Sequence, residues 1–206
     1  MQPSTQGQGD GDGPARDAEE FVLRVCEPIW RRHRFAPQGR TLVEYGSEDG
    51  HLARAFAARF GIVLGFDPRA ESVDEARRRH GHVPNLHFTL AREGTLSQVP
   101  EGGVDFCFSS CGLSRGTPGH SLPPVLRELS KVLKPGGLVQ FRVLEERGGA
   151  PSVLARIARW AFPFATGGTD PTACLERTIA GAGLRTVELR RTKRGEMWVL
   201  ARKPWE

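Results

Sequence analysis

The stretch LVEYGSEDGHLA, residues 42–53, contains the strongest fold signal in this chain. Its apolar start predicts a strand, Gly46 and Gly50 predict a tight turn, and the residues after Gly50 predict a helix. Free backbone N–H groups at the start of such a helix point outward, and a glycine there lets a ligand approach the backbone closely. Two spaced glycines are common in proteins, so this stretch alone indicates only a candidate ligand turn.

An acidic residue follows the next predicted strand, at residues 62–66. Asp67 lies 21 residues beyond Gly46, and a carboxylate at such a strand end can accept hydrogen bonds from a ribose diol. The alternative is structural, because Asp67 and Pro68 could simply begin a turn and cap the next helix. The spacing between the glycine turn and the acid favours a nucleoside pocket.

Strand and helix patterns alternate along most of the chain. The strand of the opening stretch spans residues 41–45, further apolar strands are predicted over 86–90, 104–108 and 138–143, and helices over 71–79 and 124–133. Such alternation is typical of a parallel sheet covered on both faces. Apolar residues alternate again near positions 187–189 and 197–201, which predicts an antiparallel hairpin. The expected fold is α/β: a Rossmann-like, doubly wound, seven-stranded sheet that is mostly parallel with a C-terminal antiparallel hairpin.

The 206 residues fit one domain, expected over 17–206. Residues 1–16 have little to bury and are expected to form a disordered tail. A helix is expected from Asp17, with an interruption at Pro28. Residues 145–170 are rich in glycine, arginine and aromatic residues, and they are a candidate substrate lid.

Composition excludes several classes of protein. No run of apolar residues is long enough for a membrane span, and the start has no secretory leader pattern, so a cytoplasmic setting is expected. The formal net charge is +5, but 25 of the 29 basic residues are arginines scattered along the chain, so a nucleic-acid partner is not expected. The four cysteines and six histidines show no metal-type spacing, and no metal is expected.

From about residue 35 to 203, the chain resembles the class I S-adenosylmethionine (SAM) dependent methyltransferases, in particular those that act on small molecules. The stretches that carry the resemblance are LVEYGSEDGHLA, GFDPRAESVDEAR, VDFCFSS and LRELSKVLKPGGLVQF. The resemblance implies SAM as the cofactor, with Glu44 near its methionine end, Asp67 at its ribose, and the end of VDFCFSS facing the methyl group. The expected cofactor-binding residues are Glu44, Gly46, Ser47, Gly50, Asp67, Pro68, Glu93 and Ser109.

Two positions depart from the family pattern. Glu48 stands where the family has the central glycine of the first turn, and it adds negative charge, with Asp49, beside the cofactor's carboxylate. Arg92 stands where the family usually offers an acid to the adenine, and a guanidinium cannot accept a hydrogen bond. Adenine recognition would then rest on backbone groups or on Glu93.

The residues do not identify a catalytic group. His120 is a candidate for a general base, and an exposed loop histidine is its simpler interpretation. Trp160, Phe162 and Phe164 could cover an apolar acceptor or pack on the sheet as an insert. The leading hypothesis is therefore a SAM-dependent methyltransferase of a small, partly apolar molecule. The alternatives are a degenerate binding or scaffolding protein of the same fold, and an RNA or protein methyltransferase. The sequence does not indicate the oligomeric state.

Overall fold

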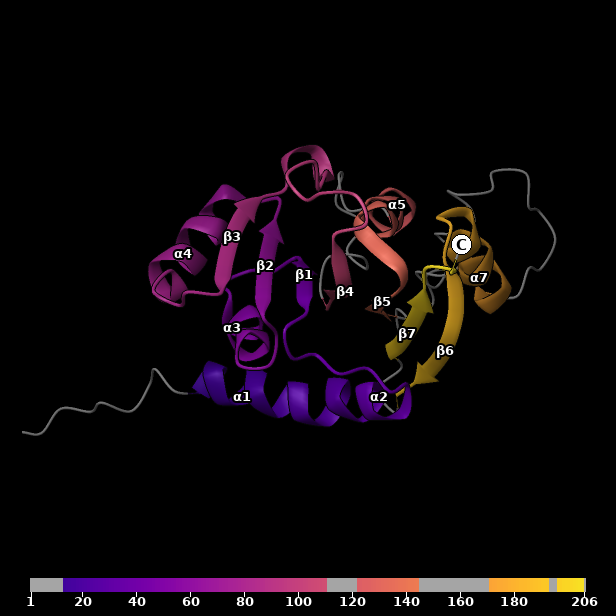
Figure 1. The fold of residues 1–206 in the computed structure, drawn as a ribbon, viewed down its shortest axis with the longest axis horizontal. Coiled ribbons are helices and arrows are strands. Elements are labelled where there is room, and N and C mark those ends of the chain that lie inside the picture. Colours follow the sequence, from indigo (N-terminus) through magenta and orange to yellow (C-terminus); the bar gives the residue numbers. More distant parts are fainter. Residues whose placement is uncertain (1–12, 111–121, 145–170, 193–195, 206) are drawn as a thin grey trace, which may run out of the picture.

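The computed structural model describes residues 13–110, 122–144, 171–192 and 196–205, and these form a seven-stranded sheet flanked by helices (Figure 1). The strand order is β3-β2-β1-β4-β5-β7-β6, with β7 antiparallel to both of its neighbours. The strands are β1 (Thr41–Tyr45), β2 (Ile62–Asp67), β3 (Leu86–Leu90), β4 (Val104–Ser109), β5 (Leu133–Leu144), β6 (Arg185–Arg191) and β7 (Glu196–Arg202). The expected α/β class, strand number and terminal hairpin are confirmed.

Helices cover both faces of the sheet, and each face has its own apolar cluster. One face carries α1 (Gly13–Phe21), η1 (Val22–Cys26), α2 (Glu27–Arg32), α3 (His51–Ala57) and α4 (Ala70–His80). The other face carries α5 (Leu122–Val132) and α7 (Pro171–Gly181). A short 3-10 helix, η2 (Arg92–Gly94), follows β3. Because β1 and β4 are central, their side chains are buried on both faces, which explains their continuous apolar runs.

The N-terminal helix differs from the expectation in two ways. It begins at Gly13, so residues 13–16 are helical and not part of a tail. The expected interruption is a π-helical turn, η1, just before Pro28. Proline has no N–H to donate to the preceding turn, and π-turns often appear where the regular bonding of a helix is broken. Residues 1–12 lie outside the described part of the chain, so a tail there stays a prediction.

Strand β5 is longer than expected. It includes Lys134–Gly137, which lie between the predicted helix at 124–133 and the predicted strand at 138–143. Gly136 N–H donates to the Lys203 carbonyl, and Lys203 N–H donates to the Gly137 carbonyl, so the C-terminal segment extends the pairing. The register between β4 and β5 shifts here, and Gly136 has a φ of +75°. The Pro-Gly-Gly segment is therefore an irregular part of the sheet.

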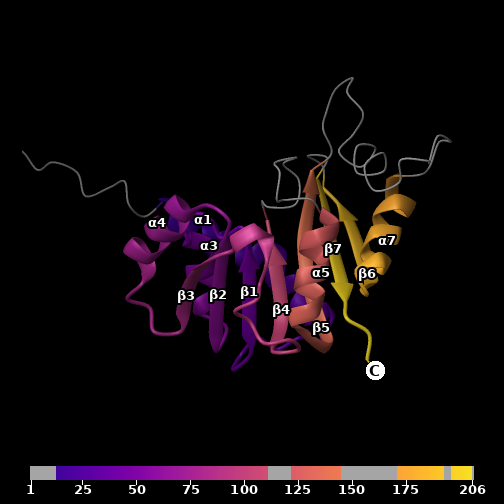
Figure 2. The ribbon, with the colours of Figure 1, turned by 90° about the horizontal axis from the view of Figure 1, so that it is seen from above.

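The five parallel strands end on the same side of the sheet, opposite to the side on which the chain ends after β7 (Figure 2). In such sheets, ligands bind outside the carboxyl ends of the strands, where the strand order reverses. Here the order reverses between β1 and β4. Within the described residues, no helix is long and apolar enough to cross a membrane.

Candidate functional site

Backbone hydrogen bonds hold the turn between β1 and α3 against β2. Gly46, Glu48 and Gly50 have φ values of +80°, +48° and +83°. The N–H groups of Gly46 and Ser47 donate to the Phe66 carbonyl at 2.7 and 3.0 Å. Glu48 is one of two non-glycine residues with positive φ in the described chain, so it adopts the backbone conformation that glycine favours.

Asp67 holds this turn from the end of β2. Its side chain is almost fully buried, and its Oδ2 accepts a hydrogen bond from Glu48 N–H at 3.0 Å. Its Oδ1 accepts from the Arg69 backbone N–H at 3.0 Å and from Arg69 Nε at 3.1 Å. A carboxylate offers about four lone-pair sites, so these three contacts leave little capacity for a diol. Arg69, whose side chain is 56% exposed, would have to move for Asp67 to accept two further hydrogen bonds.

Glu44 is the least satisfied acid of the site. The residue is 1% exposed, and among the described residues its Oε2 has no hydrogen-bond partner. Burial, followed by the charges of Glu48, Asp49 and Asp67, raises the pKa of Glu44 well above its usual value. The Oγ atom of Ser47 is also buried without a partner in the described part of the chain. A buried acid with an unsatisfied oxygen is typical of a site where a ligand supplies a cation or a hydrogen-bond donor.

Gly50 is required by packing. A Cβ atom built on Gly50 would lie 2.6 Å from Cζ of Phe88 and 3.1 Å from Cβ of Ala76. A Cβ on Gly65, in β2, would lie 2.6 Å from Cδ1 of the same Phe88 ring. The side of Gly50 that a side chain would occupy therefore faces β3 and α4. Phe88 is thus the group that leaves no room for a side chain at Gly50, and contact between the Gly50 backbone and a ligand stays a prediction.

The end of β4 is fixed by an arginine from β5. Arg142 Nε donates to the Ser110 carbonyl at 2.9 Å, and its Nη1 lies 3.0 Å from Glu196 Oε1. The guanidinium carbon lies 5.8 Å from the centre of the Trp198 ring. Ser109, just before this contact, is 1% exposed, and its Oγ has no partner among the described residues. The end of β4 is thus positioned by β5 and β7.

The loop after β3 is joined to Asp67 by a backbone hydrogen bond. Ala91 N–H donates to the Asp67 carbonyl at 2.9 Å. Arg92 is exposed and, with Asp74 and Arg77 of α4, lines a hollow of about 290 Å³ beside this loop. The Glu93 side chain lies outside the described part of the structure, so its expected contact with adenine stays a prediction.

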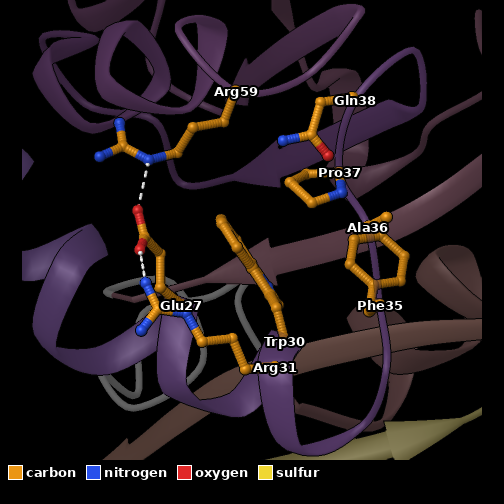
Figure 3. Close-up of a pocket in the computed structure, with 8 residues that line it drawn as sticks. All are labelled: Glu27, Trp30, Arg31, Phe35, Ala36, Pro37, Gln38 and Arg59. Carbon is orange, nitrogen blue, oxygen red and sulfur yellow. Dashed lines mark hydrogen bonds and ion pairs between the residues drawn. The ribbon is translucent and has the colours of Figure 1, made fainter.

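A second hollow, also of about 290 Å³, is lined by residues of α2 and of the segments that precede β1 and β2 (Figure 3). Glu27 joins Arg59 and Arg31 across one side of it, with Nε–Oε1 and Nη2–Oε2 distances of 3.1 and 3.0 Å. Trp30 and Phe35 form its aromatic side. The Glu27–Arg59 pair joins α2 to the segment that follows α3, so we interpret this hollow as part of the packing and not of the candidate site.

The structure brings together most of the residues expected from the sequence. Glu44, Gly46, Ser47, Gly50, Asp67 and Pro68 belong to the adjoining ends of β1 and β2, and Ser109 ends the neighbouring β4. His120, Trp160, Phe162 and Phe164 lie outside the described residues. In the described part of the chain, no group of three or more His, Cys, Asp or Glu side chains could hold a metal ion.

Sequence reasoning missed the contacts of Arg69, Phe88 and Arg142. Only one of them had a signal in the sequence. Gly65 interrupts an apolar strand, and a glycine inside a strand often marks the close approach of another group, here the Phe88 ring. The contacts of Arg69 and Arg142 depend on side-chain paths that no local pattern encodes.

Comparison with protein families identifies a methyltransferase domain at residues 42–137. The chain is 32% identical over 108 residues to a malonyl-[acyl-carrier protein] O-methyltransferase of Serratia marcescens, covering 52% of this chain and 39% of that protein. It is 32% identical over 144 residues to the ubiquinone/menaquinone biosynthesis C-methyltransferase UbiE of Rubrivivax gelatinosus, covering 66% and 49%. The chain thus spans about half the length, or less, of these two curated relatives.

Solved structures show the same fold at low sequence identity. A SAM-dependent methyltransferase from Aquifex aeolicus has a TM-score of 0.62 at 16% identity, over 92% of this chain and 98% of that one. A geranyl diphosphate C-methyltransferase from Streptomyces coelicolor has a TM-score of 0.63 at 16% identity, over 92% and 76%. Residues 42–137 of this chain therefore match a methyltransferase domain, and the chain shares its fold with solved SAM-dependent methyltransferases.

Proposed function

We propose that this protein is a cytoplasmic, SAM-dependent methyltransferase whose acceptor is a small, partly apolar molecule. The observation that carries the proposal is the pair of buried acids, Glu44 and Asp67, at the ends of adjacent parallel strands and on either side of one glycine turn. The small-molecule acceptor is supported by the relatives, whose names describe a malonyl group carried on a protein and a step of ubiquinone and menaquinone biosynthesis.

The residues fit the cofactor that the family uses. Glu44 Oε2 and the Oγ atoms of Ser47 and Ser109 are buried polar atoms without partners in the described structure, so they can pair with polar groups of a ligand. Glu44 would hold the ammonium group, Asp67 the ribose, and Ser109 would lie near the acceptor. When bound, SAM supplies a methyl group on a positively charged sulfur, which a lone pair of the acceptor can attack.

The residues of the chain serve mainly to position the two reactants, and less to provide acid–base catalysis. Attack on a sulfonium methyl group needs an acceptor lone pair in line with the carbon–sulfur bond, and holding two reactants in that geometry can account for most of the rate. Arg142 fixes the Ser110 carbonyl at the end of β4, and Asp67 fixes the turn that carries Glu48. A general base is needed only if the acceptor must lose a proton, and His120 stays a weak candidate for it.

One observation favours a protein of this fold that has lost its activity. Both oxygens of Asp67 already accept hydrogen bonds from the chain, and Glu48 and Asp49 place further negative charge near Glu44. If this setting prevents binding, the protein acts as a binding or scaffolding partner. An RNA or protein acceptor would keep SAM binding and change only the second substrate.

Calorimetric titration with SAM and with S-adenosylhomocysteine tests the proposal. We expect both ligands to bind with one site per chain. Asp67→Asn should weaken binding by about 1.5–3 kcal/mol, the range for hydrogen bonds to charged groups, while one acceptor oxygen is kept for the turn. A thermal melt of the variant separates lost binding from lost folding. Failure of both ligands to bind the folded parent would reject the enzyme and favour the scaffold.

The acceptor site is tested by a second variant. Replacing Trp160 and Phe164 by Ala should leave SAM affinity unchanged and sharply reduce methyl transfer, if these rings cover the acceptor. If they belong to the core instead, the same variant should lose several kcal/mol of stability. Normal turnover by a folded variant would exclude the lid.

A further inference from the structure

Four carboxylates crowd around the turn between β1 and α3. Glu44 and Asp67 are buried, and Glu48 and Asp49 are half-buried on the turn itself. Asp67 is paired with Arg69, and Asp49 Oδ2 lies 3.4 Å from His51 Nε2. Among the described residues, no cationic side chain forms an ion pair with Glu44 or Glu48. The turn therefore has an excess of negative charge that these neighbours do not neutralise.

Glu48 is present at a position where its backbone is strained. Its φ of +48° is unfavourable for any residue with a Cβ atom, and glycine would adopt it freely. Its N–H bond to Asp67 needs only the backbone, so a glycine would make the same contact. The turn does not need the Glu48 side chain for its shape, and what that side chain adds is charge.

Glu44 gives the second, independent sign of a cationic ligand. Its Oε2 is buried and has no partner in the described structure, and it lies on the strand that leads into the turn. The charges of Glu48, Asp49 and Asp67 raise its pKa further after the effect of burial. An unpaired buried acid among other acids is relieved when a cation binds.

We propose that the amino-acid end of this pocket binds the ammonium group of its ligand and repels the carboxylate. The site then takes an adenosyl sulfonium whose side chain ends in an amine without a carboxylate at least as well as it takes SAM. The reason is geometric: the ammonium and carboxylate of an amino acid share one carbon atom, so the acids that attract the first also repel the second. The inference rests on the proposed SAM site and adds a charge preference to it.

Calorimetry with three ligands tests the preference: SAM, S-adenosylhomocysteine, and decarboxylated SAM, which is the same sulfonium without its carboxylate. We expect decarboxylated SAM to bind the parent at least as tightly as SAM. Glu48→Gln should tighten SAM binding by roughly three- to tenfold, the effect of removing one charge several ångströms away in a half-solvated site, and should change the decarboxylated ligand less. Glu176→Gln, which removes one exposed charge from α7, should change neither affinity.

Glu48→Gly provides a second variant, because it removes the same charge and also relieves the backbone. Tighter binding of SAM than of decarboxylated SAM by the parent would overturn the inference. An affinity ratio that is the same in the parent and in both Glu48 variants would also overturn it. If SAM and S-adenosylhomocysteine bind but the affinities for SAM and decarboxylated SAM contradict the inference, the proposed function stands without this charge preference. If none of the three ligands binds, both the proposed function and this inference fail.

Discussion

Asp105, at the amino end of β4, and Glu44, at the carboxyl end of β1, are both buried carboxylates, but their surroundings are opposite. Asp105 accepts hydrogen bonds from Lys134 Nζ at 2.8 Å, from Thr41 N–H at 3.1 Å and from Arg40 Nη1 at 3.4 Å. Glu44 Oε2 has no partner among the described residues. Burial raises the pKa of Asp105, but Lys134, Thr41 and Arg40 lower it by more, whereas burial and further acids all raise the pKa of Glu44.

The difference shows which end of the sheet is structural. At the amino end, the acid pairs with groups from β1 and β5 and joins the strands. At the carboxyl end, the acid is held in a setting that is unfavourable for folding. Perturbed acids and unsatisfied polar groups are concentrated at functional sites, where a ligand provides the missing partner. The same contrast gives four predictions, with decreasing effects.

Gly50→Ala should have the largest effect. The substitution places a Cβ at a φ of +83° and 2.6 Å from the Phe88 ring. We therefore expect the free energy of unfolding to fall by about 2–5 kcal/mol, from backbone strain and overpacking together. Gly102→Ala is the matched control, because Gly102 has a φ of +64° with open space around it. That control should lose only about 1–2 kcal/mol. Denaturant unfolding measures both, and equal losses would show that Phe88 moves without cost.

Asp105→Asn should destabilise the protein in a pH-dependent way. Because the folded-state pKa of Asp105 is lowered below its usual value of 3.8, its contribution is present above that value and is lost as the pH falls through the folded value. We expect the free energy of unfolding of the variant to be lower by about 1–3 kcal/mol at pH 7 and to differ little from that of the parent at acidic pH. Affinity for SAM should be unchanged. A loss of the same size at all pH values would assign the effect to packing instead of charge.

Glu44→Gln should act in the opposite direction. Because the folded-state pKa of Glu44 is raised above its usual value of 4.5, the acid disfavours folding increasingly as the pH rises from that value through the folded one. We expect the free energy of unfolding of the variant to be higher by roughly 0.5–2 kcal/mol at pH 8, as often happens when a functional acid is removed. The variant should also bind SAM more weakly. Unfolding at pH 4 and pH 8 checks the sign. A loss of stability at pH 8 would show that Glu44 has a partner in the folded protein.

Glu48→Gly should have the smallest effect on stability. Relief of the positive φ is worth about 1–2 kcal/mol, and the greater freedom of glycine in the unfolded chain offsets about 0.5–1 kcal/mol of it. We therefore expect a gain between about 0 and 1.5 kcal/mol, measured by denaturant unfolding. Arg34→Gly is the matched control, because Arg34 has a φ of +53° outside the site. Destabilisation at Glu48 alone would mean that its side chain stabilises the turn.

Local patterns in the sequence were enough to predict the sheet. The strands at residues 41–45 and 86–90 have the predicted bounds, because a run of apolar residues between turn signals limits a strand directly. The glycine turn and Asp67 were predicted at their strand ends for the same reason. The N-terminal helix was less predictable. No cap signal in the sequence indicates its start at Gly13. Pro28 predicted an interruption, but not that it takes the form of a π-turn at Val22–Cys26.

Only the tertiary structure decided how the predicted residues are used. Spacing placed Asp67 beside the turn, but it could not show that Arg69 and the Glu48 backbone already occupy its oxygens. Spacing also marked Gly50, but the ring that requires a glycine there, Phe88, is 38 residues away on β3. Patterns along the chain report the conformation of neighbouring residues. The partners of a buried charge and the space around a glycine are set by residues that folding brings together from distant positions.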